Sequence, residues 1–296
     1  MDPILSIQNI SKSYGPIQAL KNVSFDVPEG CVFGVLGPNG SGKTTLLGII
    51  LDVLIAKSGS YSWFGGMSHD AARRQIGALL ETPNFYHYLS AFNNLEITSA
   101  ISKRGKDDRD RVLKQVGLFE RKDSKFHTFS LGMKQRLAIG AALLGNPKVL
   151  VLDEPTNGLD PVGIAEIREL IRKLNSEGLT IIIASHLLDE IEKVCTHVAI
   201  LKKGDLLLNG PVNEVLLSED QVEVRADDMA KLQQLLQTMN GVKKTNLVNN
   251  TLQLTCDPVI TPMQVNEFCI SNGIVLSHLL LRKKSLETKF IELTNN

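Results

Sequence analysis

Gly37-Pro38-Asn39-Gly40-Ser41-Gly42-Lys43-Thr44 is the stretch that decides the fold. It has the pattern G-x-x-x-x-G-K-[ST] and lies between a nearly all-apolar run at residues 31–36 and a helical pattern at residues 44–51. Glycines at these spacings let backbone N–H groups close around phosphate oxygens, and the start of the next helix adds partial positive charge. We therefore expect a nucleotide site in which Lys43 reaches the β- and γ-phosphates and the Thr44 hydroxyl binds Mg²⁺.

Two further apolar runs end in polar residues. Residues 149–152 are followed by Asp153 and Glu154, and residues 181–184 are followed by Ser185 and His186. The polar ends of buried parallel strands meet at the ligand-binding edge of a sheet. We expect Asp153 to hold Mg²⁺ and Glu154 to polarise a water for attack on the γ-phosphate. Taken alone, these residues also fit an acidic turn and a structural histidine.

The rest of the first 217 residues predicts an α/β fold. Apolar runs alternate with helical patterns at residues 163–175 and 187–194, which indicates a mainly parallel sheet covered by helices. Residues 23–27 alternate between apolar and polar, as in a half-exposed antiparallel strand. Between about residues 90 and 145 the pattern is helical, which predicts a helical insertion.

A second unit is predicted after residue 217. Its order is a strand at 222–224, a helix at 229–239, strands at 243–248 and 251–256, a helix to about residue 271 and a strand at 274–281. A last helix begins at Ser285, with Leu286, Phe290 and Leu293 on one stripe. This βαββαβ order predicts a small α+β domain of the ferredoxin-like type. The expected domains are therefore residues 1–217 and 218–296.

Composition limits the possible functions. The chain has 32 Lys and Arg residues against 32 Asp and Glu residues, and this neutral balance argues against a nucleic-acid partner. No apolar run approaches the roughly 18 residues that a membrane span needs. The four cysteines form no C-x-x-C pair, so we expect them to be small core residues rather than a metal site.

Taken together, the motifs resemble those of the ATP-binding subunits of ABC transporters over about residues 4–215. Ser130-Leu131-Gly132-Met133-Lys134-Gln135 is similar to the family signature Leu-Ser-Gly-Gly-Gln, and Gly158-Leu159-Asp160 is similar to the D-loop. Tyr14 falls where the family has an aromatic that stacks on adenine, and His186 where it has a switch histidine. The resemblance implies a P-loop NTPase cassette with a mixed sheet core, an antiparallel β subdomain and a helical subdomain.

The resemblance also implies an ATPase mechanism and residue roles. Two subunits would pair head to tail and trap two ATP molecules, with Ser130 and Gly132 of one subunit at the γ-phosphate bound by the other. The implied catalytic residues are Lys43, Glu154 as base and His186, which would hold the transition state. The implied Mg²⁺ ligands are Thr44, Glu81 and Asp153. The implied ATP-binding residues are Tyr14, Gly37, Pro38, Asn39, Gly40, Ser41, Gly42, Lys43, Thr44, Thr45, Glu81, Ser130, Gly132 and Asp160.

The sequence departs from the family pattern at two places. Leu131 replaces a glycine of the signature, which still permits a helix start, so we expect contact with ATP to survive. Glu81 stands where the family usually has the Q-loop glutamine, which adds a negative charge near ATP. A glutamate here is similar to that of ATPases for export of, or immunity to, bacitracin and lantibiotics. Residues 285–294 likewise resemble the end of drug- and antibiotic-export ATPases. Both features favour an exporter of a peptide antibiotic or drug.

The expected partners follow from these features. A motor subunit without a membrane span needs a permease on a separate chain, and we expect this one to lie at the cytoplasmic face of the cell membrane. Phe85, Tyr86 and Tyr88 follow Glu81 closely and are candidates for the surface that receives the permease. One intact set of motifs favours a homodimer. The alternatives are an ABC ATPase acting on nucleic acid or the ribosome, and a regulatory module without turnover.

Overall fold

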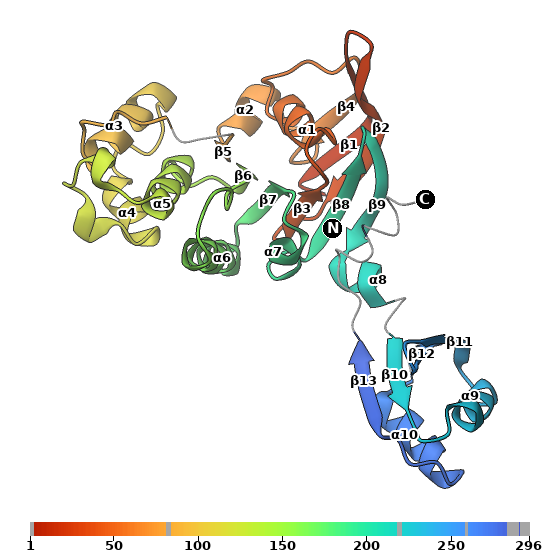
Figure 1. Ribbon diagram of the computed structural model, residues 1–296. Coiled ribbons are helices and arrows are strands. Elements are labelled where there is room, and N and C mark those ends of the chain that lie inside the picture. Colours follow the sequence, from red (N-terminus) through yellow and green to blue (C-terminus); the bar gives the residue numbers. More distant parts are fainter. Residues whose placement is uncertain (1–2, 81–83, 218–220, 258–259, 283–289, 291–296) are drawn as a thin grey trace. The chain divides into compact units, whose positions relative to one another are not determined.

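The computed structural model describes residues 3–80, 84–217, 221–257, 260–282 and 290. The chain divides into two compact units, Met1–Gly210 and Pro211–Asn296 (Figure 1). Each unit has its own hydrophobic core. The predicted boundary lies between residues 217 and 218, and residues 218–220 are outside the described part, so that boundary stays a prediction.

The first unit is built around a six-stranded sheet with the order β5-β6-β7-β3-β8-β9. Neighbouring strands from β5 to β8 are parallel. The strands are β3 (Val32–Leu36), β5 (Ile76–Leu79), β6 (Val149–Asp153), β7 (Thr180–Ser185), β8 (His197–Lys202) and β9 (Asp205–Pro211). Every residue of β3, β6 and β7 is buried, as strands covered on both faces require. The three predicted buried strands are confirmed.

The register of this sheet aligns the ends of the strands that carry the motifs. Leu36 at the end of β3 is paired with Ser185 at the end of β7, and Asp153 at the end of β6 is paired with Ala184. The residues that follow these three strands therefore emerge at the same edge of the sheet, as expected for parallel strands.

Helices pack around the sheet. They are α1 (Lys43–Ile50), α2 (His69–Arg73), α6 (Pro161–Ser176) and α7 (Leu188–Glu192). In α6 the buried residues Ile167, Leu170, Ile171 and Leu174 recur at helical spacing, so one stripe faces the sheet. The predicted helices at 44–51 and 163–175 are confirmed to within two residues, whereas α7 is shorter than the predicted 187–194.

A three-stranded antiparallel sheet with the order β2-β1-β4 completes the main body. Its strands are β1 (Leu5–Tyr14), β2 (Ile17–Val27) and β4 (Ser58–Trp63). Val23, Phe25 and Val27 of β2 are buried, while Ser24 and Asp26 between them are exposed. The predicted half-exposed antiparallel strand is confirmed.

A helical segment lies beyond β5, the edge strand of the large sheet (Figure 1). It consists of α3 (Ala91–Ser102), α4 (Arg109–Gln115), the short 3₁₀ helices η1 (Phe119–Arg121) and η2 (Phe126–Thr128), and α5 (Leu131–Ala142). Residues 90–145, all of which are described, contain no strand, so the predicted helical insertion is confirmed. A Cβ on Gly77 of β5 would lie 2.0 Å from the carbonyl oxygen of Ala142, which shows how closely α5 approaches β5.

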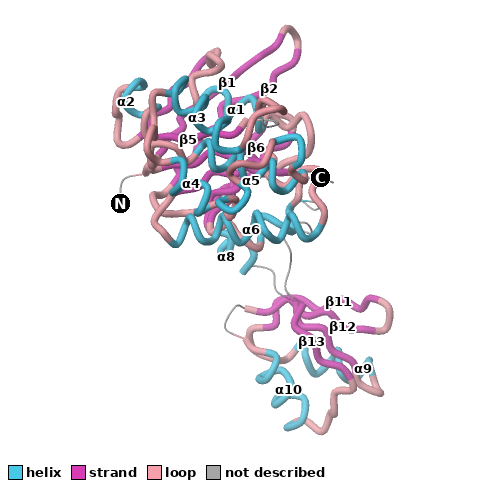
Figure 2. Tube along the Cα trace, turned by 90° about the vertical axis from the view of Figure 1, so that its left-hand side faces the viewer, coloured by secondary structure: helices cyan, strands magenta, loops and turns pink. Residues whose placement is uncertain are grey.

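The second unit has a four-stranded antiparallel sheet with the order β11-β12-β10-β13. Its elements are α8 (Val212–Leu217), β10 (Gln221–Arg225), α9 (Met229–Gln237), β11 (Val242–Val248), β12 (Thr251–Cys256), α10 (Pro262–Ser271) and β13 (His278–Arg282). The predicted order βαββαβ is confirmed, and α9 and α10 lie on the same side of the sheet (Figure 2). The ferredoxin-like assignment stays a prediction.

Local turns of this unit follow the sequence signals. Asn249 and Asn250 both have positive φ in the tight β11–β12 turn, and Thr261 caps α10 in a capping box with Gln264. The predicted strand at 274–281 is wrong at its start, because Ile274 is buried and its N–H donates to the Cys269 carbonyl oxygen, which closes α10. Of the predicted last helix, only Phe290 is described, and it is helical.

Candidate functional site

The P-loop, residues 37–44, joins β3 to α1. Gly40 and Gly42 have φ of 78° and 108°, a region that glycine adopts without strain. A Cβ on Gly37 would lie 2.3 Å from the carbonyl oxygen of Leu201, and a Cβ on Gly42 would lie 2.5 Å from that of Ala19. The loop therefore requires glycine at these positions, and Pro38, Asn39 and Gly40 at its tip are exposed.

The polar side-chain atoms of Lys43 and Ser41 lie in the interior of this loop. The buried Lys43 ammonium donates to the carbonyl oxygens of Gly37 at 2.8 Å and Pro38 at 3.4 Å. The Ser41 hydroxyl is buried and has no hydrogen-bond partner among the described residues. A buried hydroxyl left in this way costs about 1–3 kcal/mol. A phosphate oxygen that accepts its hydrogen bond would remove that cost, so the loop fits a phosphate.

Thr44 and Asp153 meet although they are far apart in the sequence. The Thr44 hydroxyl at the first turn of α1 donates to Asp153 Oδ2 at 2.8 Å, and Asp153 is buried at the end of β6. Hydroxyl and carboxylate oxygens are ligands that Mg²⁺ accepts, usually together with phosphate oxygens and water. The described residues hold no group of three or more His, Cys, Asp or Glu side chains that would bind a metal. Thr44 and Asp153 would therefore supply two of the oxygen ligands of a Mg²⁺ ion bound together with a phosphate.

Glu154 connects the P-loop to the end of β7. Its Oε1 lies 3.4 Å from the Lys43 ammonium, and its Oε2 lies 2.8 Å from His186 Nδ1. The backbone N–H of His186 also points at Oε2, at 3.4 Å. Glu154 itself has a φ of 47°, and its N–H donates to the Ala184 carbonyl oxygen at 2.9 Å. These contacts hold the carboxylate beside the phosphate loop, where it can accept a proton from water.

The structure thus brings five predicted residues together at one edge of the sheet. They are Lys43, Thr44, Asp153, Glu154 and His186. Asp153 ends β6, Glu154 follows β6, His186 follows β7, and Lys43 and Thr44 begin α1 after the loop that follows β3. The parallel register brings the ends of these buried strands to the same place. The cluster combines a phosphate cradle, two oxygen ligands, a carboxylate and an imidazole.

The other predicted residues lie at the starts of helices or at the end of a strand. Ser130 caps α5, where its hydroxyl accepts from the Met133 N–H, and Asp160 caps α6, where it accepts from the Gly163 N–H. A Cβ on Gly132 would meet nothing closer than 3.9 Å, so its surroundings are open. Tyr14 ends β1 and is 46% exposed.

Two further predicted residues remain. Thr45 is half-buried in the first turn of α1. Glu81 lies outside the described residues, so the predictions for it remain predictions.

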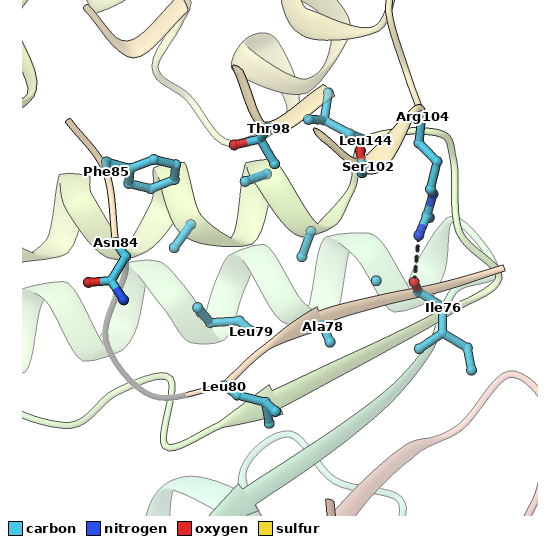
Figure 3. A pocket seen from close by; sticks show the side chains of 14 residues that line it. Ile76, Ala78, Leu79, Leu80, Asn84, Phe85, Thr98, Ser102, Arg104 and Leu144 are labelled. Atoms are coloured by element: carbon cyan, nitrogen blue, oxygen red, sulfur yellow. Dashed lines mark hydrogen bonds between the residues drawn. The ribbon is translucent and has the colours of Figure 1, made fainter. Parts of the chain in front are cut away.

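A cavity that the sequence does not reveal lies between β5 and the helical segment. It has a volume of about 370 Å³, and Figure 3 shows its lining. Leu79 lines it from β5, Leu80 from just after that strand, Phe85 from the following loop, and Thr98 from α3. Arg104 reaches across one end, where its Nη1 donates to the Ile76 carbonyl oxygen at 2.7 Å. No motif in the sequence links Thr98 or Arg104 to β5, so no signal in the sequence pointed to this cavity.

Comparison with known proteins places this geometry in a family. Residues 20–157 match the family model described as ABC transporter. The ABC transporter ATP-binding protein YhcH of Bacillus subtilis (strain 168), itself named uncharacterized, is 36% identical over 300 residues, which cover 99% of this chain and 97% of YhcH. The bacitracin transport ATP-binding protein BcrA of Bacillus licheniformis is 34% identical over 299 residues, covering 99% and 98%.

A solved structure agrees with these relatives. The cbiO1 protein of Clostridium perfringens, described as part of the ABC transporter complex cbiONQ, is 33% identical with a TM-score of 0.66, covering 73% of this chain and 91% of cbiO1. This chain belongs to the family of ABC transporter ATP-binding proteins. It is a nucleotide-binding ABC ATPase subunit, and its relatives give no support to the nucleic-acid alternative. Among the described residues, no helix has both the length and the apolar composition needed to cross a membrane.

Proposed function

We propose that this chain hydrolyses ATP with Mg²⁺ at the Lys43 cluster and so drives export of a peptide antibiotic or drug through a permease on a separate chain. The observation that carries the proposal is the position of the Glu154 carboxylate, between the Lys43 ammonium and the His186 ring. A base must lie within hydrogen-bond reach of the water that it activates, and this carboxylate adjoins the phosphate cradle.

Each residue of the cluster has a role in this proposal. The P-loop amides and Lys43 bind the β- and γ-phosphates. Thr44 and Asp153 supply oxygen ligands for Mg²⁺, which offsets phosphate charge when it is bound. Glu154 accepts the proton of the attacking water, and His186 orients that carboxylate and holds the transition state. Tyr14 is exposed at the end of β1 and stacks on adenine in this scheme.

A second copy completes the site in this proposal. Ser130 and Gly132 lie at the N-terminus of α5, where backbone N–H groups and the helix dipole favour an anion. They would contact the γ-phosphate bound by the partner copy, with Asp160 beside them. Leu131 and Val162 next to these residues are 49% and 68% exposed, which is consistent with a surface that a second subunit covers.

The permease is proposed to dock at the aromatic surface, defined as Phe85, Tyr86 and Tyr88. Tyr86 and Tyr88 are 50% and 67% exposed, and Phe85 borders the 370 Å³ cavity. A position at the cytoplasmic face of the membrane follows from such a partner. Bacitracin transport by the relative BcrA supports a peptide antibiotic as cargo. The predicted effect of Glu81 and the role of a ferredoxin-like domain at residues 218–296 remain parts of this proposal.

A Glu154→Gln variant tests the proposed base. The amide keeps the shape of the side chain but does not accept a proton, so we expect phosphate release to fall by about 100-fold or more. Because ATP is then bound without turnover, the variant should form an ATP-dependent dimer, which size-exclusion chromatography with light scattering detects. Glu120→Gln, at an exposed site in η1, is the control. Undiminished hydrolysis in the Glu154→Gln variant would show that another group is the base.

A further inference from the structure

Phe126 is the centre of an aromatic cluster in the helical segment. Its ring centroid lies 5.2 Å from that of Phe85, 5.7 Å from that of His87 and 6.2 Å from that of Phe129. Phe126 is only 2% exposed and Phe129 only 4%. The cluster therefore packs Phe85, a residue of the aromatic surface, directly against Phe126, which in turn packs against Phe129 just before α5.

Backbone hydrogen bonds hold the same two segments side by side. The N–H of Phe126 donates to the Leu89 carbonyl oxygen at 2.9 Å, and the N–H of His127 donates to that of His87 at 3.1 Å. The N–H of Ala91 donates back to the Ser124 carbonyl oxygen at 3.2 Å. Residues 87–91 and 124–127 therefore form one hydrogen-bonded unit.

This unit runs directly into the signature motif. Phe129 immediately precedes Ser130, which caps α5, and the Lys134 ammonium of α5 lies 5.4 Å from the centroid of the Phe126 ring. Phe126 is therefore joined to the start of α5 both through the chain and through space. Close-packed rings do not compress, so a displacement of Phe85 must be taken up by Phe126 and its neighbours.

We propose that Phe126 is a positioning residue that fixes the signature motif, Ser130 and Gly132, relative to the aromatic surface. A partner that displaces Phe85 thereby changes where α5 presents its N-terminus. The inference rests on the proposed function, in which the signature motif of one copy closes on ATP bound by another. Through Phe126, the displacement of Phe85 by a partner would then change the ATP concentration at which the two copies pair.

The test uses the full chain in the Glu154→Gln background, where pairing is measured without turnover. Phe126→Leu keeps an apolar side chain but removes the ring contacts. We expect it to raise the ATP concentration for half-maximal dimerisation roughly three- to tenfold, the equivalent of one or two aromatic contacts. Nucleotide affinity of the monomer, measured by fluorescence titration, should not change, because the P-loop is untouched.

Phe119→Leu is the matched control. Phe119 lies in η1 of the same helical segment, and its ring contacts in the described residues are with the ammonium groups of Lys114 and Lys122. The Phe119→Leu variant should dimerise at the same ATP concentration as its parent. Melting temperatures of all variants show whether a change reflects loss of folded protein.

Phe85→Leu separates positioning from general loss of packing. If Phe85 acts through Phe126, the Phe85→Leu and Phe126→Leu double variant will need no more ATP than the more impaired single variant. The inference would be overturned if the fold-changes of the two single variants multiplied in the double variant. It would also be overturned if the Phe126→Leu variant dimerised at the same ATP concentration as its parent. Failure of the parent Glu154→Gln protein to dimerise with ATP would instead count against the proposed function.

Discussion

At the scale of single residues, the site depends on Glu154 holding an unusual backbone conformation. Its φ of 47° is left-handed, which costs a non-glycine residue about 1–3 kcal/mol. The hydrogen bond from its N–H to the Ala184 carbonyl oxygen and the contacts of its carboxylate with Lys43 and His186 offset that cost. The turn after β6 therefore directs one carboxylate toward Thr44 and the next toward Lys43.

The hydroxyl of Thr44 provides a residue-scale prediction. Thr44→Val keeps the shape of the side chain but removes the donor to Asp153 Oδ2 and one proposed Mg²⁺ ligand. We expect ATP hydrolysis to fall about 100-fold, as when one group that stabilises the transition state is lost. Thr44→Ser, which keeps the hydroxyl, should stay within about tenfold of the parent rate. Steady-state phosphate release over a range of MgCl₂ concentrations measures both variants. If the Thr44→Val variant hydrolysed ATP at the parent rate, Thr44 would not be part of the proposed metal site.

At the scale of elements, local signals in the sequence place the helix starts. Ser90, Ser130, Asp160, Asp228 and Thr261 each accept a hydrogen bond from a backbone N–H three residues further on. Strands β4, β5, β8 and β9 were not predicted. The sequence of β5 is Ile-Gly-Ala-Leu, which has neither alternation nor a long apolar run, and it becomes a strand through its pairing with β6.

Asp108 links two elements and provides a pH-dependent prediction. The side-chain hydrogen bond from Arg111 of α4 holds the pKa of the Asp108 carboxyl below its ordinary value, partial burial opposes this, and the N–H of Gly145 beyond α5 adds a second donor. Because the folded-state pKa is lowered, this stabilisation is complete above the unfolded pKa of about 3.8 and is lost as pH falls through the folded-state pKa.

We therefore expect Asp108→Asn to lower the free energy of unfolding of the first unit by about 1 kcal/mol at pH 7. The difference from the parent should shrink as pH falls from 3.8 through the lower folded-state pKa, because the parent carboxyl is then protonated in both the folded and the unfolded state. Urea titrations at several pH values measure it, and Asp107→Asn at the exposed neighbouring position is the control. A difference that does not depend on pH would contradict the ionic origin of the effect.

At the scale of the whole molecule, the described residues of the two units form separate hydrophobic cores. The core of the first unit is formed by residues of both of its sheets and of α1, and that of the second unit by residues such as Val224, Leu236 and Leu254. Each set of side chains is buried within its own unit. A change in one core is therefore expected to leave the other core intact.

Leu254→Ala tests this independence. Leu254 is fully buried, so the variant should destabilise the second unit by about 2–5 kcal/mol. Calorimetry should show one unfolding transition moving to lower temperature, while nucleotide affinity stays at the parent value. Val151→Ala in the first core is the reciprocal variant and should shift the other transition. A single transition that moves in both variants would show that the two units unfold together.

The sequence by itself determined the P-loop, the apolar runs that become β3, β6 and β7, the helical insertion and the order of elements in the second unit. These features depend on glycine conformations, helix caps and periodicity, which act between residues close in the chain. The tertiary structure decided which strands are neighbours, and so it brought Asp153, Glu154 and His186, more than a hundred positions along the chain, to Lys43 and Thr44. It also formed the cavity beside β5 and the cluster around Phe126. Such contacts depend on pairing and packing between distant segments, which no local pattern specifies.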